Sequence, residues 1–511
     1  MPNEERRRLV LVTMCVAQFL AILDVTVVNL ALPAIHRDLG SGMSDLQWII
    51  DAYVLVYASL LLTGGTIGDR YGRKRAFVTG MALFALGSAV SAAAPQLDVL
   101  LVGRIAQGAG AAAFGPATLS ILTQAFPHGP QRAKAIGIWS GTSGLALVVG
   151  PIAGGALVHT LGWQSIFLLN LLVAAAGLMA GLMTVTESKA PRHSRLDPFG
   201  QALAVLWLGA LTFALIEGAR LGLRAPLILT LLALAAIGCV AFVLVETRRE
   251  HPMLPLALFR RPTFAACNVV ILLVGFGLFG SFFFLSLFLQ QIQGYPAGEA
   301  GLRLLPLMVA IVITAPIAGR LAGRFGARPP MVVGLTLTGC GLLALTGVGV
   351  ATPYAAWWPA LLPIGLGLGL TMAPTNAALM GSVELPRTST ASAMGSTSQQ
   401  VGSLLGIAVL GAIVTVKLDE ATRRAVPGLS EEVRDRLSDA RMGSSSGEVP
   451  VGVDPQTLSD ALNQGFVAGM HRGLLLGAIA YFLGAVTAVV FVRQRSDSGE
   501  SSTDTERQHT A

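Results

Sequence analysis

The segment GTIGDRYGRK at residues 65–74 joins two apolar runs, and a degenerate copy, GRLAGRFGAR, occupies residues 319–328. Asp69 is the one clear loss, because Gly323 stands in its place. The copies follow the second and the tenth apolar runs, which predicts an internal repeat of two halves inserted in the same orientation. The matched pairs are Gly65 and Gly319, Arg70 and Arg324, Gly72 and Gly326, and Lys74 and Arg328.

The chain around this repeat is strongly apolar. Of its 511 residues, 53% are hydrophobic and 12% are charged, whereas soluble domains carry about 25% charged residues. The apolar residues form blocks near the ~20 residues that a helix needs to cross a bilayer. We therefore expect an all-α polytopic membrane protein. Its fourteen predicted spans are 9–32, 47–67, 76–94, 97–120, 135–157, 163–185, 198–216, 226–246, 263–289, 301–322, 330–350, 357–380, 391–416 and 467–492.

The basic residues indicate the orientation. Loops on the N-terminal side of the spans hold most of them, whereas short loops on the other side hold little beyond Arg37, Arg220 and Arg224. Because positive loops stay cytoplasmic, we expect both termini in the cytoplasm and the protein in the cell membrane. The same topology accounts for the net charge of +7 without a nucleic-acid partner.

Six spans in each half would make spans seven and eight an insert. The expected domains are an N-terminal six-helix bundle at 1–186, a two-helix insert with flanking loops at 187–252, a C-terminal six-helix bundle at 253–493, and a disordered cytoplasmic tail at 494–511. The C-terminal bundle includes a polar outer loop at 417–466, and this loop and the tail are too polar to predict a further folded domain.

One acid, Asp24, interrupts the apolar run AILDVTVVNLALP at residues 21–33. At 1.5 Å per residue it lies ~13 Å from the outer end of the first span, Asp51 lies ~6 Å into the second, and Arg104 lies ~10 Å from the outer end of the fourth. Counting along the spans therefore brings three ionisable side chains into the outer half of the N-terminal bundle.

This placement favours proton coupling by Asp24, Asp51 and Arg104. Burial disfavours an ionised carboxylate and a nearby arginine favours it, so a group held between these effects can change protonation with conformation. Alternatives remain: Asp24 as a purely structural ion pair, Asp51 as an interfacial residue near water, and Arg104 as an arginine that extends to the interface. Which carboxylate carries the proton stays open.

Helical angles separate the polar residues of the first span. Gln18 and Asn29 share a face, Thr26 lies near it, and Asp24 points about 120–140° away. We expect Asp24 to serve protonation or locking and Asn29 to line a substrate path.

Two glycine-containing motifs predict close helix contacts or conformational control. In the loop, Gly65, Asp69, Arg70, Gly72, Arg73 and Lys74 form a candidate conformational latch, although positive-inside topology alone explains the cations. In the fifth span, GLALVVGPIAGG at 144–155 has a proline that bends the helix and glycines that admit a neighbour. The residues of this second motif are Gly150, Pro151, Gly154 and Gly155.

These motifs resemble those of the major facilitator superfamily. The loop resembles the signature between its second and third helices, and GPIAGG resembles the motif of its antiporters. RIAQGAG, which begins at Arg104, is similar to the fourth-helix motif, whose arginine is implicated in proton transfer. LDVTVVNLALP and WIIDAY resemble the first two helices of the fourteen-span drug:proton antiporters. The resemblance implies two six-helix bundles plus two inserted helices.

The function that the resemblance implies is export of amphipathic small molecules by alternating access, driven by the proton gradient. No cofactor is expected, and the chain lacks the GxxxxGK[ST] loop of ATP-driven proteins. We expect a monomer whose partners are the substrate, protons and the lipid bilayer. Spans ten and thirteen carry no carboxylate, which favours neutral, zwitterionic or monocationic substrates over dications.

The substrate cavity is expected between the halves. Its candidate lining consists of polar, aromatic and sulfur-containing side chains of the central spans: Gln18, Asn29, Gln107, Phe279, Phe283, Met308, Asn376, Gln399 and Gln400.

The same residues also bear on other functions. A dedicated exporter of one natural product is the alternative. A receptor should carry a soluble signalling domain, and an enzyme should show a cluster of His, Asp, Ser or Cys at a membrane face. The loops show neither, and the cysteines and histidines lack metal-ligand spacing, so we expect no enzyme and no metal site.

Overall fold

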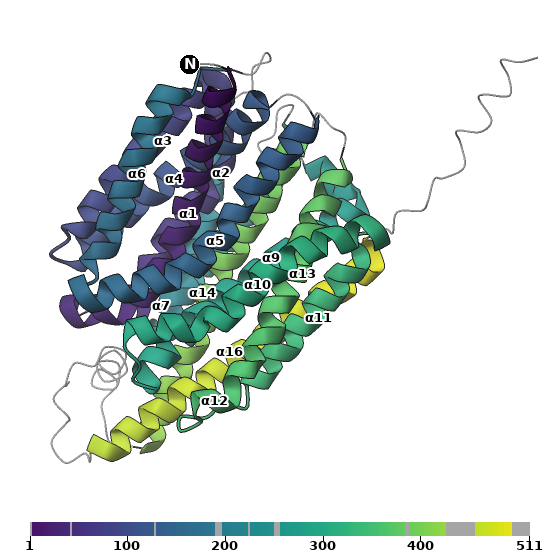
Figure 1. Cartoon of the computed structure of the whole chain (residues 1–511). Helices are drawn as coiled ribbons and strands as arrows, with labels where there is room; N and C mark the ends of the chain where they lie inside the picture. Colours follow the sequence, from purple (N-terminus) through teal and green to yellow (C-terminus); the bar gives the residue numbers. More distant parts are fainter. Residues whose placement is uncertain are drawn as a thin grey trace, which may run out of the picture.

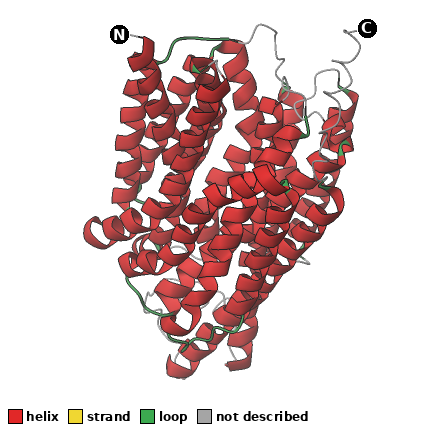
Figure 2. Ribbon diagram, turned by 45° about the vertical axis from the view of Figure 1, so that its right-hand side comes forward, coloured by secondary structure: helices red, strands yellow, loops and turns green. Residues whose placement is uncertain are grey.

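The computed structural model describes residues 3–40, 43–126, 129–189, 197–222, 225–249, 256–383, 388–425 and 455–492. In these ranges the regular secondary structure is entirely helical (Figures 1 and 2). Thirteen helices are long and apolar enough to cross a membrane, and α2, which bends by 51° between Ser44–Leu61 and Thr63–Tyr71, makes a fourteenth. The predicted count of spans is therefore confirmed.

The first six spans form the N-terminal half. They are α1 (Asn3–Leu39), α2 (Met43–Tyr71), α3 (Arg73–Ala92), α4 (Leu97–Ala125), α5 (Gly129–Leu161) and α6 (Gln164–Thr184). The insert follows as α7 (Pro198–Leu221) and α8 (Pro226–Arg248).

The C-terminal half has six further spans with short helical additions. They are α9 (Pro262–Leu287), which continues as η2 (Phe288–Ile292), α10 (Ala297–Phe325), α11 (Arg328–Leu345), α13 (Leu361–Gly381), α14 (Thr388–Ala425) and α16 (Pro455–Phe491). The additions are η1 (Leu256–Arg260), α12 (Tyr354–Trp357) and η3 (Trp358–Ala360).

The two halves repeat one packing pattern. In the N-terminal half α3 packs against α4 and α6, and α1 packs against α5; in the C-terminal half α11 packs against α13 and α16, and α9 packs against α14. The matching neighbours are what an internal repeat with parallel halves requires.

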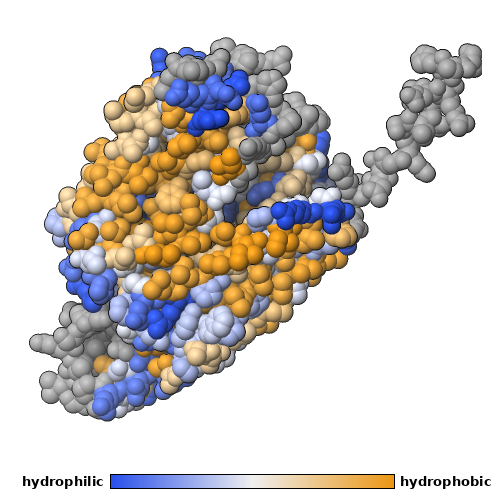
Figure 3. Space-filling model, in the orientation of Figure 1, coloured by the Kyte–Doolittle hydropathy of each residue, from blue (hydrophilic) through white to orange (hydrophobic). Residues whose placement is uncertain are grey.

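A belt of apolar side chains surrounds the helices. Figure 3 shows this belt across the middle of the molecule, with hydrophilic residues gathered toward its ends. Leu86, Val102, Met183, Ile237 and Val490 are among the large apolar side chains that are more than half exposed. In water such a surface would be costly, whereas in a bilayer it faces hydrocarbon. The chain is thus a multi-pass membrane protein.

The helices extend further than the apolar runs predict around the segment assigned to an outer loop at 417–466. α14 continues to Ala425, supported by an Arg423–Asp419 ion pair of 2.9 Å one turn apart, and α16 begins at Pro455. Leu458, Leu462 and Phe466 form a buried stripe on this early part of α16. The stripe was missed because polar residues separate its members. Residues 426–454 and the tail predicted at 494–511 lie outside the described residues.

The insert lies across the seam between the halves. α7 packs against both α2 of the first half and α14 of the second, whereas α8 packs mainly against α7. Two hydrogen bonds join α7 to α2: Gln201 donates to the Ser59 carbonyl at 2.9 Å, and Trp48 donates to Glu217 at 3.3 Å. These bonds attach the insert to the N-terminal half.

In the described residues, α5 of one half and α10 of the other pack most closely at one end. A Cβ on Gly301 of α10 would lie 2.2 Å from the Pro151 carbonyl oxygen of α5, and a Cβ on Gly155 would lie 2.6 Å from the Ala297 carbonyl oxygen. Toward the end that carries the N-terminus, a Cβ on Gly141 or Gly319 would meet nothing within 4 Å. There the two halves diverge (Figures 1 and 2). The structure is therefore closed at the end opposite the N-terminus.

This packing predicts that Gly301→Ala opens the closed end. The added methyl group cannot fit against the Pro151 carbonyl, so α5 and α10 must separate, whereas Gly319→Ala on the same helix enters open space. The measurement is the distance between spin labels at the exposed residues Leu161 and Leu302, with the native cysteines replaced. Gly301→Ala should lengthen this distance and Gly319→Ala should leave it unchanged; equal distances in both variants would contradict the assignment.

Candidate functional site

The Asp24 carboxylate is the centre of a buried polar network in the N-terminal half. Arg104 Nη1 of α4 donates to Asp24 Oδ2 at 2.8 Å, and Asn170 Nδ2 of α6 donates to Oδ1 at 2.6 Å. Gln107 Nε2 adds a third, longer contact to Oδ1 at 3.3 Å. All four side chains are completely buried.

The arginine is held on several sides. Arg104 Nε donates to the Ile49 carbonyl of α2 at 2.9 Å, and Nη1 also donates to Gln107 Oε1 at 2.9 Å. Its guanidinium lies 4.6 Å from the centroid of the Tyr53 ring. A planar cation fits this environment because it combines hydrogen bonding with stacking. Arg104 therefore points into the bundle, and the alternative of an arginine that extends to the interface is wrong.

The network joins five helices. Gln107 Nε2 donates to Ser88 Oγ of α3 at 2.9 Å, which adds α3 to α1, α2, α4 and α6. Sequence reasoning missed Ser88 and Asn170, although an asparagine in the apolar opening of the sixth span was a visible signal. The Asp24 carboxylate thus accepts from an arginine and two amides, and its partners come from α4 and α6.

Asp51 of α2 lies apart from this network. It is completely buried, and neither carboxylate oxygen has a hydrogen-bond partner in the described part of the chain. Four residues earlier, Gln47 lies where a Cβ on Gly411 of α14 would be, and four residues later, Leu55 lies 3.9 Å from the place of a Cβ on Gly209 of α7. On a helix Asp51 falls between these two directions. It thus faces the junction of α2, α7 and α14, away from water and from the Asp24–Arg104 pair.

A small cavity of about 10 Å³ lies between the halves. α1 contributes Val25, Thr26 and Asn29, and α9 and α10 contribute Leu278, Phe279, Phe282, Met308 and Ile311. Asn29, Phe279 and Met308 were all among the predicted lining residues. Asn29 faces this cavity while Asp24 faces the N-terminal bundle, which is the separation that the helical angles predict.

The other predicted lining residues are placed differently. Gln107 belongs to the Asp24 network, and Phe283 is buried against Phe284 with ring centroids 4.7 Å apart. Gln18 donates to Ser143 Oγ of α5 at 2.9 Å. Gln107 and Phe283 therefore belong to the packed interior, because each is rotated away from the seam on its helix. Asn376 is exposed, and Gln399 and Gln400 are half-buried on α14.

The loop motif is stabilised by an internal ion pair and by the carboxylate of Glu187, which lies outside the motif. Asp69 pairs with Arg73 at 2.9 Å, and the Glu187 carboxylate accepts from the backbone N–H groups of Lys74 at 3.1 Å and Arg75 at 3.3 Å. Gly72 has a φ of 128°, and a Cβ there would lie 2.4 Å from Glu187 Oε1. Glu187 was missed; its position shortly after the sixth span, on the side of four cations, was the available signal.

The remaining motif residues occupy simpler positions. Lys74 Nζ donates to the Leu182 carbonyl of α6 at 2.7 Å, and the exposed Arg70 lies 5.4 Å from the centroid of the Tyr71 ring. A Cβ on Gly65 would make an ordinary contact with Pro116 of α4 at 3.6 Å. In this state the loop motif is linked to α6 and to the segment just after it.

The α5 motif serves two contacts. A Cβ on Gly150 would lie 2.0 Å from Thr26 Oγ1 of α1, and one on Gly154 would lie 3.1 Å from Val27. Pro151 and Gly155 meet α10 of the opposite half, as described above. One stretch of small residues thus fixes α5 within its own half and brings it against the other half.

Among the described residues, no group of three or more His, Cys, Asp or Glu side chains is placed to hold a metal ion. The fold and site together define a helical membrane protein of two bundles, with a cavity between them and a buried ion pair in one of them.

Comparisons with known proteins identify the class further. The profile of the Major Facilitator Superfamily matches residues 14–407. The chain is 35% identical over 493 residues to the Multidrug resistance protein Stp of Mycobacterium tuberculosis, covering 93% of this chain and 89% of that protein. It is 33% identical over 492 residues to the Tetracenomycin C resistance and export protein of Streptomyces glaucescens, covering 93% and 90%.

A solved structure has the same fold. A bacterial homolog of the human lysosomal transporter Spinster, in an inward-facing and unoccupied conformation, superposes with a TM-score of 0.63 at 19% identity, covering 96% of this chain and 99% of that one. The chain belongs to the Major Facilitator Superfamily and is a transporter rather than an enzyme.

The buried ion pair yields a stability prediction. Arg104→Met leaves the Asp24 carboxylate buried without its countercharge, which should cost about 3–5 kcal/mol and lower the apparent unfolding temperature followed by intrinsic fluorescence. The double variant Asp24→Asn with Arg104→Met should recover much of the loss. Arg324→Met, at an exposed arginine of α10, is the control and should change little. A single Arg104→Met variant as stable as the control would refute the assignment.

The loop yields a second prediction. Gly72→Ala must strain the backbone, at a cost of about 1–3 kcal/mol, and it displaces Glu187, so trypsin should cut at Arg73–Arg75 several-fold faster. Gly68→Ala is the matched control, because its Cβ would lie at an ordinary 3.5 Å from Ala76. Digestion of reconstituted protein, followed by mass spectrometry, measures both rates. Equal rates would show that Gly72 is not required for the loop.

Proposed function

We propose that this transporter is a proton-coupled antiporter that exports amphipathic small molecules, such as antibiotics or related natural products. The observation that carries the proposal is the Asp24–Arg104 pair: a charged pair, completely buried, at the centre of a polar network that joins five helices of one half. Intramembrane ionisable groups of this kind are characteristic of ion and proton pathways. The names of the relatives, which record multidrug resistance and tetracenomycin C resistance and export, support export as the direction.

The proton step would use the two carboxylates differently. In the present state Asp24 accepts three hydrogen bonds, so we infer that proton uptake by this carboxylate goes with movement of Arg104 or loosening of these bonds. Asp51 has no hydrogen-bond partner among the described residues, so its protonation would break no such bond. We infer that a change at the α2–α7–α14 junction alters access to Asp51, and that separation of Asp24 from Arg104 accompanies protonation. Either event ties protonation to the relative position of the helices.

The substrate step would use the cavity between the halves. This cavity combines the amide of Asn29 and the hydroxyl of Thr26 with the apolar side chains Leu278, Phe279 and Phe282. An amphipathic molecule matches this lining. No carboxylate is among the described residues that line the cavity, which favours neutral, zwitterionic or monocationic substrates, because a dication would lack a countercharge.

Alternating access would then expel the substrate. The halves are open toward the N-terminal end, which the positive loops assign to the cytoplasm. Substrate would enter from that side, and rocking of the halves would open the end where α5 and α10 now meet. The alternative, a dedicated exporter of one natural product, shares this mechanism. A panel containing methylenomycin A, tetracenomycin C, puromycin and unrelated dyes separates the two.

The proposal predicts that Asp24→Asn abolishes transport driven by a pH gradient. The amide keeps the size of the side chain but cannot bind and release a proton, so accumulation in vesicles with an acidic interior should fall by at least tenfold. Asp51→Asn should reduce accumulation as well, and the exposed Asp98→Asn of α4 is the control. Substrate binding to purified protein and its unfolding temperature check folding. Wild-type accumulation by Asp24→Asn would refute proton coupling through this residue.

A further inference from the structure

The insert helix α7 carries a polar residue, Thr212, in the middle of its buried face. This face is a stripe that recurs at every fourth residue and is at most 5% exposed: Ala204, Leu208, Thr212 and Ile216. On the other side of the helix, the Cβ of Trp207 lies 2.9 Å from the place of a Cβ on Gly238 of α8. Because α7 packs against α2 and α14 as well as α8, the stripe is the face that α7 turns toward α2 and α14.

Two pairs of neighbours fix how α7 is aligned with α2: Trp48 with Phe213, and Leu55 with Gly209. The ring centroids of the first pair are 5.9 Å apart, and in the second pair the leucine side chain lies 3.9 Å from the place of a Cβ on the glycine. The order of these pairs shows that the two helices run in opposite directions. Asp51, which lies between the two contact positions of α2, is therefore at the level of Thr212.

Asp51 and Thr212 both point into the junction of α2, α7 and α14. Both are completely buried. Neither carboxylate oxygen of Asp51 nor the hydroxyl of Thr212 has a hydrogen-bond partner in the described part of the chain. Buried polar atoms without partners are costly. An acid and a hydroxyl in this condition, at one level of one junction, can satisfy each other.

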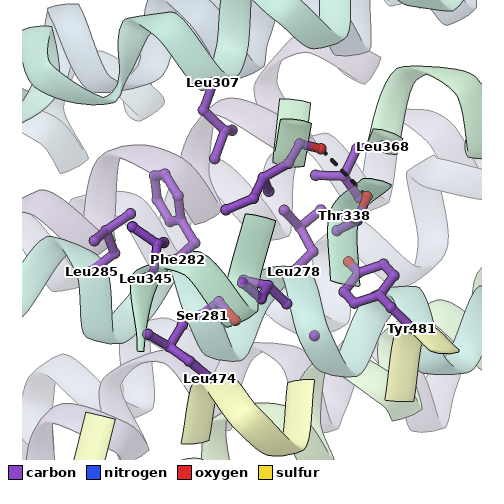
Figure 4. Close-up of a pocket in the computed structure, with 13 residues that line it drawn as sticks. Leu278, Ser281, Phe282, Leu285, Leu307, Thr338, Leu345, Leu368, Leu474 and Tyr481 are labelled. Atoms are coloured by element: carbon purple, nitrogen blue, oxygen red, sulfur yellow. Dashed lines mark hydrogen bonds between the residues drawn. The ribbon is translucent and has the colours of Figure 1, made fainter. Parts of the chain in front are cut away.

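The cavity inside the C-terminal half offers no comparable site. Its volume is about 20 Å³, room for about one water molecule, and Figure 4 shows leucines and Phe282 around it. The hydroxyl of Ser281 there also lacks a partner among the described residues, but no carboxylate is among the residues that line this space. The pairing of an acid with a hydroxyl thus distinguishes the α2–α7–α14 junction.

We propose that Thr212 positions the proton of Asp51. When Asp51 takes up a proton from water, its carboxyl O–H donates to Thr212 Oγ1, and this bond stabilises the neutral acid inside the closed junction. The ionised carboxylate forms when α14 separates and water reaches it, and water then takes the place of the hydroxyl. The inference rests on the proposed function, because it names the partner of one of the two carboxylates assigned to proton coupling.

The way α7 is attached explains how the bond would follow the transport cycle. Gln201 and Glu217 bond α7 to α2, so Thr212 moves together with Asp51. The contact with α14 belongs to the opposite half, and there a Cβ on Gly411 would lie 1.8 Å from Gln47 Nε2. Opening of the closed end separates α14 from α2 and α7 and admits water to Asp51. The insert is then part of the proton site.

Other ionisable groups around the junction are remote from Asp51 or face away from it. On α2, Asp45 lies in the first helical turn, and Tyr53 faces Arg104. On α7, Glu217 lies further out, at Trp48. From Thr388 to Val416, α14 has no ionisable side chain. The rival acceptor for the proton is neutral: Gln47 Oε1, one turn from Asp51, also lacks a partner among the described residues.

The test follows the carboxyl C=O band of Asp51 in infrared difference spectra, acidic minus alkaline, of reconstituted protein. The band that Asp51→Asn removes is assigned to Asp51. In Thr212→Val this band should move to higher wavenumber, because the carboxyl group loses its hydrogen bond. The pH at which the band reaches half its height should fall by about one unit, since one hydrogen bond to the neutral form contributes about tenfold in proton affinity.

Three further variants identify the acceptor. Thr212→Ser keeps the hydroxyl and should restore both the band position and its pH dependence. Thr230→Val makes the same substitution on α8, at an exposed threonine that bonds to the Pro226 carbonyl, and should change neither. Gln47→Leu should also leave the band in place. The unfolding temperature checks that each variant is folded.

The outcomes separate this inference from the proposed function. A band that stays in place in Thr212→Val, a band that moves only in Gln47→Leu, or the absence of any band removed by Asp51→Asn would overturn the role of Thr212. Uptake into vesicles with an acidic interior tests the function itself, with methylenomycin A, tetracenomycin C and puromycin as probes. No uptake of any probe by the wild type refutes proton-coupled export, whereas uptake together with an unmoved band refutes the Thr212 bond alone.

Discussion

The Asp24–Arg104 pair connects residues 80 positions apart in the chain, and the packing of the N-terminal half is arranged around it. Two opposite charges are stable in a membrane interior only when every neighbour compensates for lost water. Asn170 of α6, the Ile49 carbonyl and the Tyr53 ring of α2, and Gln107 of α4 itself supply that compensation. The same contacts make the pair sensitive to helix movement, because a shift of any one helix alters the environment of the carboxylate.

Small residues provide the complementary constraint. Gly150 and Gly154 bring α5 against α1, and Pro151 and Gly155 bring it against α10 across the seam. Across the seam these small residues meet backbone carbonyls and leave no room for a side chain, so the contact between α5 and α10 is either formed or broken. A seam of this kind suits two discrete arrangements of the halves better than gradual deformation.

Two polar residues of α1 face different surroundings. Asp24 faces the N-terminal bundle, while Asn29 on the same helix faces the cavity between the halves. The proton site and the substrate site therefore share α1 without sharing a surface. In the proposed cycle, movement of α1 would couple them.

The sequence by itself determined the spans, their count, the repeat and the opposite faces of Asp24 and Asn29, because hydropathy and helical periodicity act over short distances along the chain. It also brought Asp24 near Arg104 in depth. Only the tertiary structure decided that Asp51 faces a different junction, that Phe283 packs inward, and that Glu187 completes the loop motif. Depth in a membrane follows from counting residues, whereas the direction of a side chain between helices depends on how each helix is rotated against its neighbours, and that is set by packing across the whole bundle.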